Sequence, residues 1–364
     1  MIRTYIDKDN RFFEAFNTET GFYLRSGVHD EEGNDTEIDP FLRNYPQLLD
    51  VGIMGHCIHG KSGLCVKSGV ECYQSGLTRH EPNMQLSDYQ SIVEQGKDKV
   101  FQIALGGRGD PNKHENFKEI LELTRKNSIV PNYTTSGLDL TDEEIALSKR
   151  HCGAVAVSWY GHDFTLNAIN RFIKAGVKTN IHYVLGRQSI DEAIGHLTSN
   201  SFPEGVNAVI FLLHKPVGQG TRENVLLSDD PKVREFFNLV DLGTKDRSYK
   251  IGFDACSIPG ILNFTKNIDR TSIDTCEGSR HSAYITSDNK MLPCSFDQDL
   301  RWAVDLSKNS ILDAWNSEEF YRFRETFSSS CNGCSDQEEC RGGCPIVREI
   351  VLCDRPVKSL ADAE

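Results

Sequence analysis

The stretch LLDVGIMGHCIHGKSGLCVKSGVECY, residues 48–73, joins a short apolar run to a glycine-rich loop that carries three cysteines. The run LLDVGIM (48–54) has the length and composition of a buried strand. The loop contains Cys57, Cys65 and Cys72, spaced Cys-x7-Cys-x6-Cys. Three thiolates can hold three irons of a 4Fe–4S cluster and leave the fourth iron open for an outside ligand. A zinc site completed by His56 or His59 is the alternative.

Five more apolar runs of strand length follow, separated by amphipathic segments of helical period. Each run ends in a polar or glycine-rich loop, and chemistry in parallel β/α folds gathers at such strand ends. Six units in sequence predict an α/β fold, a partial (β/α)6 TIM-like barrel. The runs are VFQIAL (100–105), IVPNYTT (129–135), AVAVSW (154–159), KTNIHYVL (178–185) and NAVIFLL (207–213); the loops are GGRGDP, TTSG, SWYG, LGR and HKPVGQG.

The sequence on either side of these units has a different character. Residues 1–45 show alternating runs broken by turn signals, which predicts a small β preamble. Beyond residue 250 the chain is irregular and rich in cysteine, which indicates a small domain organised around metal. The predicted domains are the preamble (1–45), the barrel (46–215), a connecting segment (216–250) and a small irregular C-terminal iron–sulfur domain (251–364).

The densest cysteine pattern lies near the C-terminus, as Cys331-x2-Cys334-x5-Cys340-x3-Cys344-x8-Cys353. It is preceded by Cys276-x12-Asn289-x4-Cys294. The start of the chain lacks an export signal, so we expect a cytoplasmic protein in a reducing compartment. There, 12 cysteines indicate metal or redox chemistry rather than a disulfide frame.

The front cysteine loop and the strand-end loops resemble those of the radical SAM enzymes, whose usual spacing is Cys-x3-Cys-x2-Cys. The resemblance implies that an open iron binds S-adenosylmethionine (SAM) and that SAM is cleaved to a 5′-deoxyadenosyl radical. It places Tyr73 and Val184 beside the adenine and the backbone of the GGRGDP loop at the methionine amino group. Arg108 stands in that loop where the family commonly has an acid. The implied SAM-binding residues are Tyr73, Gly106, Gly107, Arg108, Ser136, Ser158 and Val184.

The rear cysteines resemble the SPASM domain, an extension with auxiliary iron–sulfur clusters found on radical SAM peptide and protein maturases. Asn289 replaces the glycine of the usual pattern. The resemblance implies a first auxiliary cluster on Cys276, Cys294 and Cys344, and a second on Cys331, Cys334, Cys340 and Cys353.

The role of Cys256, in GFDACSIPG, stays open from the sequence. It is a candidate fourth ligand of the first auxiliary cluster, a buried thiol, or a hydrogen-atom donor to a substrate radical. Asp297 and His214 are further candidate catalytic residues.

The resemblance implies a radical SAM maturase that abstracts hydrogen from a ribosomally made precursor peptide. The product would be a thioether, a carbon–carbon crosslink or an epimer. An external electron donor such as flavodoxin or ferredoxin is implied. No winged-helix segment for leader binding is evident, so a separate leader-binding protein or the sheet at 1–45 would recruit the peptide.

Three other classes of protein remain as alternatives. They are a radical SAM enzyme for a small molecule or a protein side chain, a non-catalytic electron carrier with several clusters, and a zinc-ribbon interaction module. The net charge of −13 argues against nucleic acid as a partner. The longest apolar runs fall short of the 18 residues that suggest a membrane span.

Overall fold

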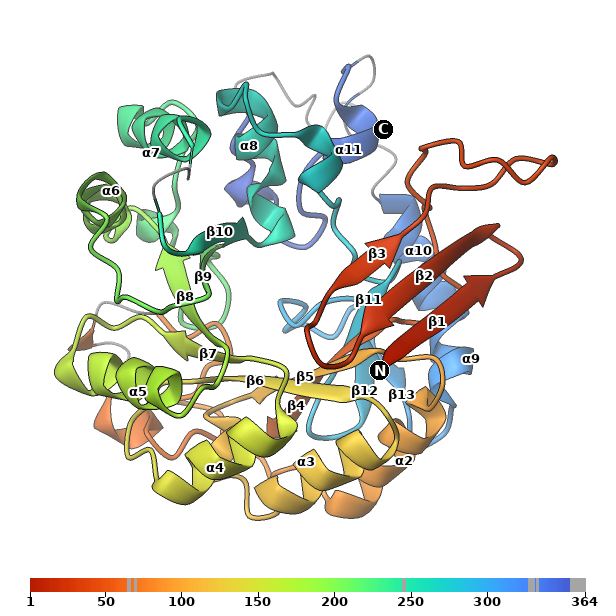
Figure 1. Ribbon diagram of the computed structural model, residues 1–364, viewed down its shortest axis with the longest axis horizontal. Coiled ribbons are helices and arrows are strands. Elements are labelled where there is room, and N and C mark those ends of the chain that lie inside the picture. Colours follow the sequence, from red (N-terminus) through yellow and green to blue (C-terminus); the bar gives the residue numbers. More distant parts are fainter. Residues whose placement is uncertain (64–66, 69–70, 244–246, 327–330, 332–333, 354–364) are drawn as a thin grey trace.

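The computed structural model describes residues 1–63, 67–68, 71–243, 247–326, 331 and 334–353. Among these residues, ten strands form one sheet in the order β10-β9-β8-β7-β6-β5-β4-β11-β12-β13 (Figure 1). All neighbours from β10 to β11 pair in parallel. The parallel strands from the barrel region are β4 (Leu48–Met54), β5 (Gln102–Gly107), β6 (Val130–Thr135), β7 (Val155–Ser158), β8 (Thr179–Leu185), β9 (Ala208–Leu213) and β10 (Lys250–Phe253).

Helices cover the outer face of this curved sheet (Figure 1). In β4 the residues Leu49, Val51 and Ile53 are fully buried, whereas Asp50 alternates with them and faces the barrel interior. The six predicted strand–helix units are therefore confirmed, and β10 adds a seventh parallel strand. The covering helices are α2 (Leu86–Gly96), α3 (Phe117–Lys126), α4 (Asp142–His151), α5 (Asp163–Lys174), α6 (Ile190–Ser199) and α7 (Pro231–Asp241).

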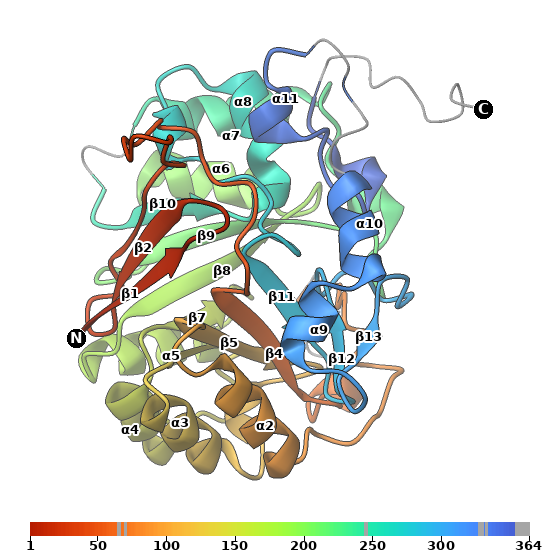
Figure 2. The same ribbon diagram turned by 90° about the vertical axis from the view of Figure 1, so that its right-hand side faces the viewer.

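The C-terminal region joins the same sheet. Strand β11 (Ser282–Ile285) pairs in parallel with β4, and β12 (Lys290–Leu292) and β13 (Val304–Asp305) extend the sheet in antiparallel pairs. Figure 2 shows α9 and α10 beside these strands. The domain boundaries at residues 215 and 250 stay predictions, since the sheet runs across them. The helices of this region are α8 (Ile258–Phe264), α9 (Ile311–Trp315), α10 (Glu318–Thr326) and α11 (Gln337–Cys340).

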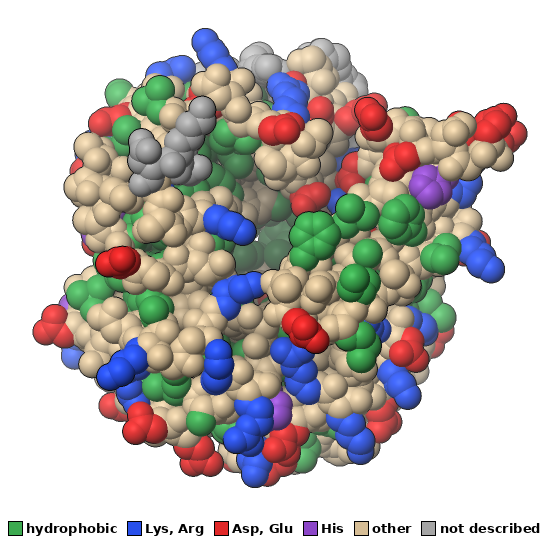
Figure 3. Space-filling model, viewed as in Figure 1, with side chains coloured by type: hydrophobic (Ala, Val, Ile, Leu, Met, Phe, Trp, Pro, Cys, Tyr) green, Lys and Arg blue, Asp and Glu red, His purple; other side chains and the backbone are tan. Residues whose placement is uncertain are grey.

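The predicted N-terminal β preamble is a small antiparallel sheet of β1 (Ile2–Asp7), β2 (Phe12–Asn17) and β3 (Tyr23–Arg25). Its apolar side chains Ile2, Ile6, Phe13 and Leu24 lie exposed on the outer face, and Figure 3 shows hydrophobic side chains over these strands. The inner face of β2 buries Phe12, Glu14 and Phe16, and Phe16 stacks on Phe101 of the barrel.

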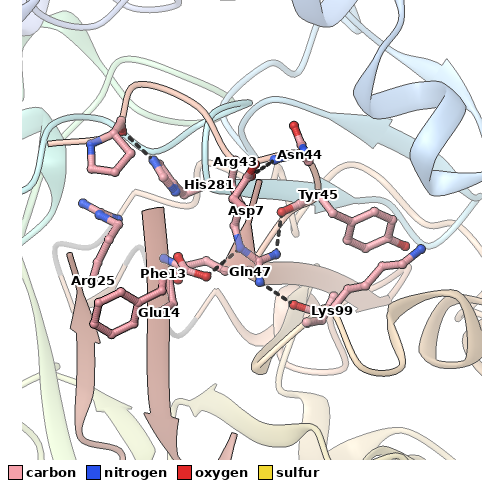
Figure 4. Close-up of polar contacts among 12 residues, drawn as sticks. Asp7, Phe13, Glu14, Arg25, Arg43, Asn44, Tyr45, Gln47, Lys99 and His281 are labelled. Atoms are coloured by element: carbon pink, nitrogen blue, oxygen red, sulfur yellow. Dashed lines mark hydrogen bonds and ion pairs between the residues drawn. The ribbon is translucent and has the colours of Figure 1, made fainter. Parts of the chain in front are cut away.

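Arg43 joins the N-terminal sheet to the barrel (Figure 4). Its guanidinium donates to Glu14 Oε2 over 2.7 Å and to the carbonyl oxygens of Tyr45 and Lys99 over 2.6 and 2.8 Å. Both side chains of the Arg43–Glu14 ion pair are fully buried. Three donor positions are thus satisfied away from water, which fixes the sheet in one orientation.

Across the parts of the chain that the structure describes, no helix combines the length and the apolar composition needed to cross a membrane.

Candidate cluster and cofactor site

The front cysteine loop follows β4 at the carboxyl end of the sheet. A Cβ placed on Gly76 would lie 3.4 Å from Cys72 Sγ and 3.9 Å from Cys57 Sγ, so both sulfurs lie next to the same backbone position. The Gly76 N–H also donates to Cys72 Sγ over 3.4 Å. Cys65 lies outside the described residues. The structure therefore brings together the two described thiols of the predicted triad.

The GGRGDP loop after β5 packs directly on the front cysteine loop. Gly107 and Gly109 have φ values of 107° and 139°, which side chains rarely adopt. A Cβ on Gly107 would lie 2.4 Å from Met54 O, and one on Gly109 would lie 3.1 Å from Cys57 Cα. Glycine is therefore required at both positions for the two loops to meet.

The loop after β9, residues 214–221, holds the other end of the front cysteine loop. Gly218 has a φ of 65°, and a Cβ there would lie 2.2 Å from Tyr73 O. The Gln219 N–H donates to Cys72 O over 3.0 Å. Thr221 donates to the Glu71 carboxylate from its N–H and its hydroxyl, over 2.6 and 2.8 Å. The front loop is thus clamped between the loops after β5 and β9.

His214, a predicted catalytic candidate, is part of this clamp. Its Nε2 lies 3.0 Å from Thr221 O and 3.4 Å from Glu71 Oε2. Burial lowers the pKa of His214. These contacts give His214 a structural role in the loop, and its catalytic role stays a prediction.

The residues predicted to bind SAM line the same end of the barrel. Ser158 and Val184 occupy inward-facing, half-buried positions of β7 and β8. Ser136 is engaged with a neighbour, since its N–H and hydroxyl donate to the Asp110 carboxylate over 2.8 and 2.5 Å. Arg108 is also engaged: its guanidinium donates to Gln74 O over 3.0 Å.

Tyr73 links the front loop to the C-terminal domain. Its ring lies 4.5 Å from that of Phe296, between centroids. Burial raises the pKa of the Tyr73 phenol to about 12, although hydrogen bonds with Gln74 and Ser295 oppose the rise. The neutral phenol is therefore fixed by polar and aromatic neighbours beside Cys72.

The thiols predicted for the first auxiliary cluster converge, and Cys256 joins them. Cys256 hydrogen-bonds with Cys344, which together with burial raises the pKa of Cys256. Burial and the nearby Cys256 raise the pKa of Cys276 to about 12. Burial, Cys276 and Cys256 also raise the pKa of Cys294. Cys256 thus interacts with each of the other three half-buried thiols, and of the three roles the sequence left open for Cys256 this arrangement favours that of ligand.

The thiols predicted for the second auxiliary cluster lie near the end of the described chain. Burial raises the pKa of Cys340, and both Cys331 and Cys353 lie close enough to add to this rise. The N–H groups of Gly342 and Gly343 point at the Cys340 sulfur and oppose it. Cys334 donates its N–H to Cys331 O over 3.0 Å, in one turn.

All-thiolate donor sets of this kind fit iron–sulfur clusters. Within the ranges given above, no three His, Cys, Asp or Glu side chains surround a point as the ligands of a single metal ion do. The half-buried histidines of the front loop contact other groups: His56 Nδ1 lies 3.2 Å from Glu81 O, and His59 Nε2 lies 3.5 Å from Asp110 Oδ2.

Lys215 is a buried residue of this region that the sequence analysis missed. Its ammonium lies 2.6 Å from Asp254 Oδ2 and 4.3 Å from the centroid of the Phe296 ring. Burial opposes its charge, but Asp254 and then Cys256 outweigh burial and raise the pKa of Lys215. Its position in the HKPVGQG loop, directly after a predicted strand, could have indicated Lys215 as a site residue.

Asp297, another catalytic candidate, caps a turn. Its carboxylate accepts hydrogen bonds from the N–H groups of Arg301 and Trp302 over 3.2 and 3.0 Å. Its side chain is fully buried, and burial raises its pKa. Its backbone contacts account for its burial, so a catalytic role for Asp297 stays a prediction.

The C-terminal region matches a known family. Residues 276–342 match SPASM, described as an iron–sulfur cluster-binding domain, which confirms the prediction of this domain. A search of curated proteins found no match.

The fold is similar to that of several solved structures. Streptococcus suis SuiB bound to precursor peptide SuiA has a TM-score of 0.71 at 13% identity, over 97% of this chain and 98% of that chain. SuiB bound to S-adenosylmethionine has a TM-score of 0.65 at 15% identity, over 86% and 78% of the two chains. Native anSMEcpe with bound AdoMet has a TM-score of 0.58 at 16% identity, over 86% and 92%.

The chain therefore has a partial barrel fold shared with these solved structures, and its residues 276–342 form a SPASM domain. Both statements were predicted from the sequence and are confirmed.

Proposed function

We propose that this protein is a radical SAM maturase that modifies a peptide. The observation that carries the proposal is the front cysteine loop, which lies at the carboxyl end of a parallel barrel between two glycine-bearing loops. A 4Fe–4S cluster there would bind SAM at its open iron and supply a 5′-deoxyadenosyl radical on reduction.

The chain's own residues would hold and orient these groups. Cys57, Cys65 and Cys72 are the proposed ligands of the SAM-binding cluster. Gly106 and Gly107 let the backbone approach the amino acid end of SAM, because neither carries a side chain. Ser158 and Val184 face the barrel interior, where the nucleoside would lie.

We propose Cys256 as the fourth ligand of the first auxiliary cluster, with Cys276, Cys294 and Cys344. The support is the interaction of Cys256 with all three other thiols. Four protein thiolates leave no iron free for a substrate sulfur. This set therefore favours an electron-accepting role over direct binding of a substrate thiolate.

A peptide substrate is supported by the similarity to SuiB in complex with its precursor peptide, which spans nearly the whole of both chains. The proposed product is a crosslink, a thioether or an epimer. A flavodoxin or ferredoxin would supply the electron, and a leader-binding protein would deliver the peptide. The exposed apolar face of the N-terminal sheet is a surface that such a partner could cover.

The proposal is tested by anaerobic incubation of the cluster-loaded, dithionite-reduced protein with SAM. We expect 5′-deoxyadenosine, detected by chromatography and mass spectrometry, and none from a Cys72→Ala variant. Roughly twelve irons per chain are expected for three 4Fe–4S clusters. A protein loaded with iron that forms no 5′-deoxyadenosine would contradict the proposal and favour the electron carrier.

A further inference from the structure

Strand β10 (Lys250–Phe253) ends the barrel sheet, so one of its edges lacks a neighbouring strand among the residues that the structure describes (Figure 1). On its other edge, the N–H groups of Lys250 and Asp254 donate to backbone oxygens of the β9 segment, each over 3.1 Å. Backbone groups alternate in direction along a strand, so those of Ile251 and Phe253 point away from β9. No hydrogen bond from the rest of the described chain reaches these groups, which leaves a short row of donors and acceptors open to another strand.

The free edge of β10 borders a groove of about 630 Å³. The groove lies between β10, α8 and the segment 267–277. Figure 3 shows the surface hollowed between β10 and the N-terminal sheet, and Ile251, Gly252 and Phe253 are all half-buried. An unpaired strand edge beside such a groove has the form of a site for an extended peptide, which adds to the sheet as a further strand.

The groove is acidic. Its lining, as far as the structure describes it, contains four carboxylates and no Lys, Arg or His. From outside the lining, Lys215 binds one of these carboxylates, and the single guanidinium of Arg25 is shared by two others and Asp39. Negative charge therefore remains in excess, which favours a peptide segment with basic side chains. The four carboxylates are those of Asp241, Asp254, Asp274 and Glu277.

The groove also passes the first auxiliary site. Ala255 lines it directly before Cys256, and Thr275 and Glu277 line it on either side of Cys276. A peptide segment paired with β10 would thus run beside two of the proposed cluster ligands.

We propose that β10 binds the substrate by strand addition: an extended, basic peptide segment pairs with the free edge of β10 in the acidic groove. This inference rests on the proposed function, which makes a peptide the substrate. Backbone hydrogen bonds supply affinity that does not depend on the peptide sequence, and the carboxylates supply the preference for lysine or arginine. No covalent bond changes at this site.

The probe is a fluorescent, capped hexapeptide of alternating lysine and valine, and its dissociation constant is measured by fluorescence anisotropy on the cluster-loaded protein. An analogue N-methylated at every residue, which cannot donate to a strand, and one with glutamate for lysine should each bind about tenfold more weakly or worse. Ile251→Pro removes an outward N–H without breaking the ladder to β9, and it should weaken the lysine probe by a similar factor. Ile6→Pro places the same ring on the free edge of β1 and is the matched control, which should bind the probe like the wild type.

Each outcome decides the inference. Equal binding of the lysine probe and its N-methylated analogue overturns it, as does equal binding by the wild type and Ile251→Pro, or a preference for the glutamate peptide. If Ile251→Pro fails to load iron, the N-methylated analogue on the wild type still decides. Formation of 5′-deoxyadenosine from SAM is measured in parallel. A wild type that forms it but binds no probe overturns this inference alone, whereas one that forms none contradicts the proposed function.

Discussion

The N-terminal sheet depends on one buried ion pair, and Arg43→Met is expected to release it. The substitution leaves the Glu14 carboxylate buried without its partner, together with the carbonyl oxygens of Tyr45 and Lys99. Breaking a buried pair by removing one partner costs about 3–5 kcal/mol. Arg43 also lies 3.5 Å from the Tyr5 ring centroid, so a contact of the guanidinium with the aromatic face is lost as well.

Hydrogen–deuterium exchange measures this loss locally, which suits a protein whose clusters prevent simple two-state unfolding. A cost of about 3 kcal/mol corresponds to exchange about a hundredfold faster, since each 1.4 kcal/mol is a factor of ten. We expect this acceleration in the amides of β1 and β2 and little change in the barrel helices α3 to α6.

A double variant, Arg43→Met with Glu14→Gln, is the matched control. It removes the uncompensated charge, so protection of β1 and β2 should return in part. Unchanged exchange in Arg43→Met, or acceleration spread evenly over the barrel, would refute the view that this pair fixes the sheet.

Two further outcomes follow from the site. The variant Cys256→Ala should contain about four fewer irons per chain than the wild type, measured by iron analysis. The control Cys152→Ala removes a thiol outside all three cluster sets and should lose no iron. Equal iron contents in the two variants would rule out Cys256 as a ligand. Lys215→Met removes a buried cation beside Cys256 and leaves the Asp254 carboxylate without its partner. Because the site becomes more negative, the reduction potential of the first auxiliary cluster should fall by tens of millivolts, measured in a redox titration followed by electron paramagnetic resonance. An unchanged or higher potential would contradict this.

The barrel could be predicted from the sequence because strands that are buried in a parallel sheet form continuous apolar runs. The glycine-rich loops at the strand ends could also be predicted, and Gly107 and Gly218 have positive φ values that residues with side chains rarely adopt. The cysteine spacing near the C-terminus identified the SPASM domain, which the family match confirms.

The features that the sequence did not predict depend on contacts between segments far apart in the chain. A lysine in a strand-end loop is expected at the surface, but Lys215 is buried because its ammonium donates to Leu213 O and to the carboxylate of Asp254, 39 residues further on. The place of Arg108 at the cofactor stays a prediction, and nothing in the sequence indicated that its guanidinium donates to the backbone oxygens of Gln74 and Gly55. Strands β11 to β13 extend the barrel sheet, although short strands in an irregular region gave no sign of a partner.

The loop of residues 214–221 touches two metal-binding regions at once. Its residues 218–221 contact Glu71, Cys72 and Tyr73. Its residue Lys215 lies against Cys256 and Phe296. Assembly of a cluster in the front cysteine loop or at the first auxiliary site therefore restrains the 214–221 loop, which the other site also needs in its ordered position. Maturation of this protein should accordingly proceed in concert, with partly metallated chains scarce compared with empty and complete ones.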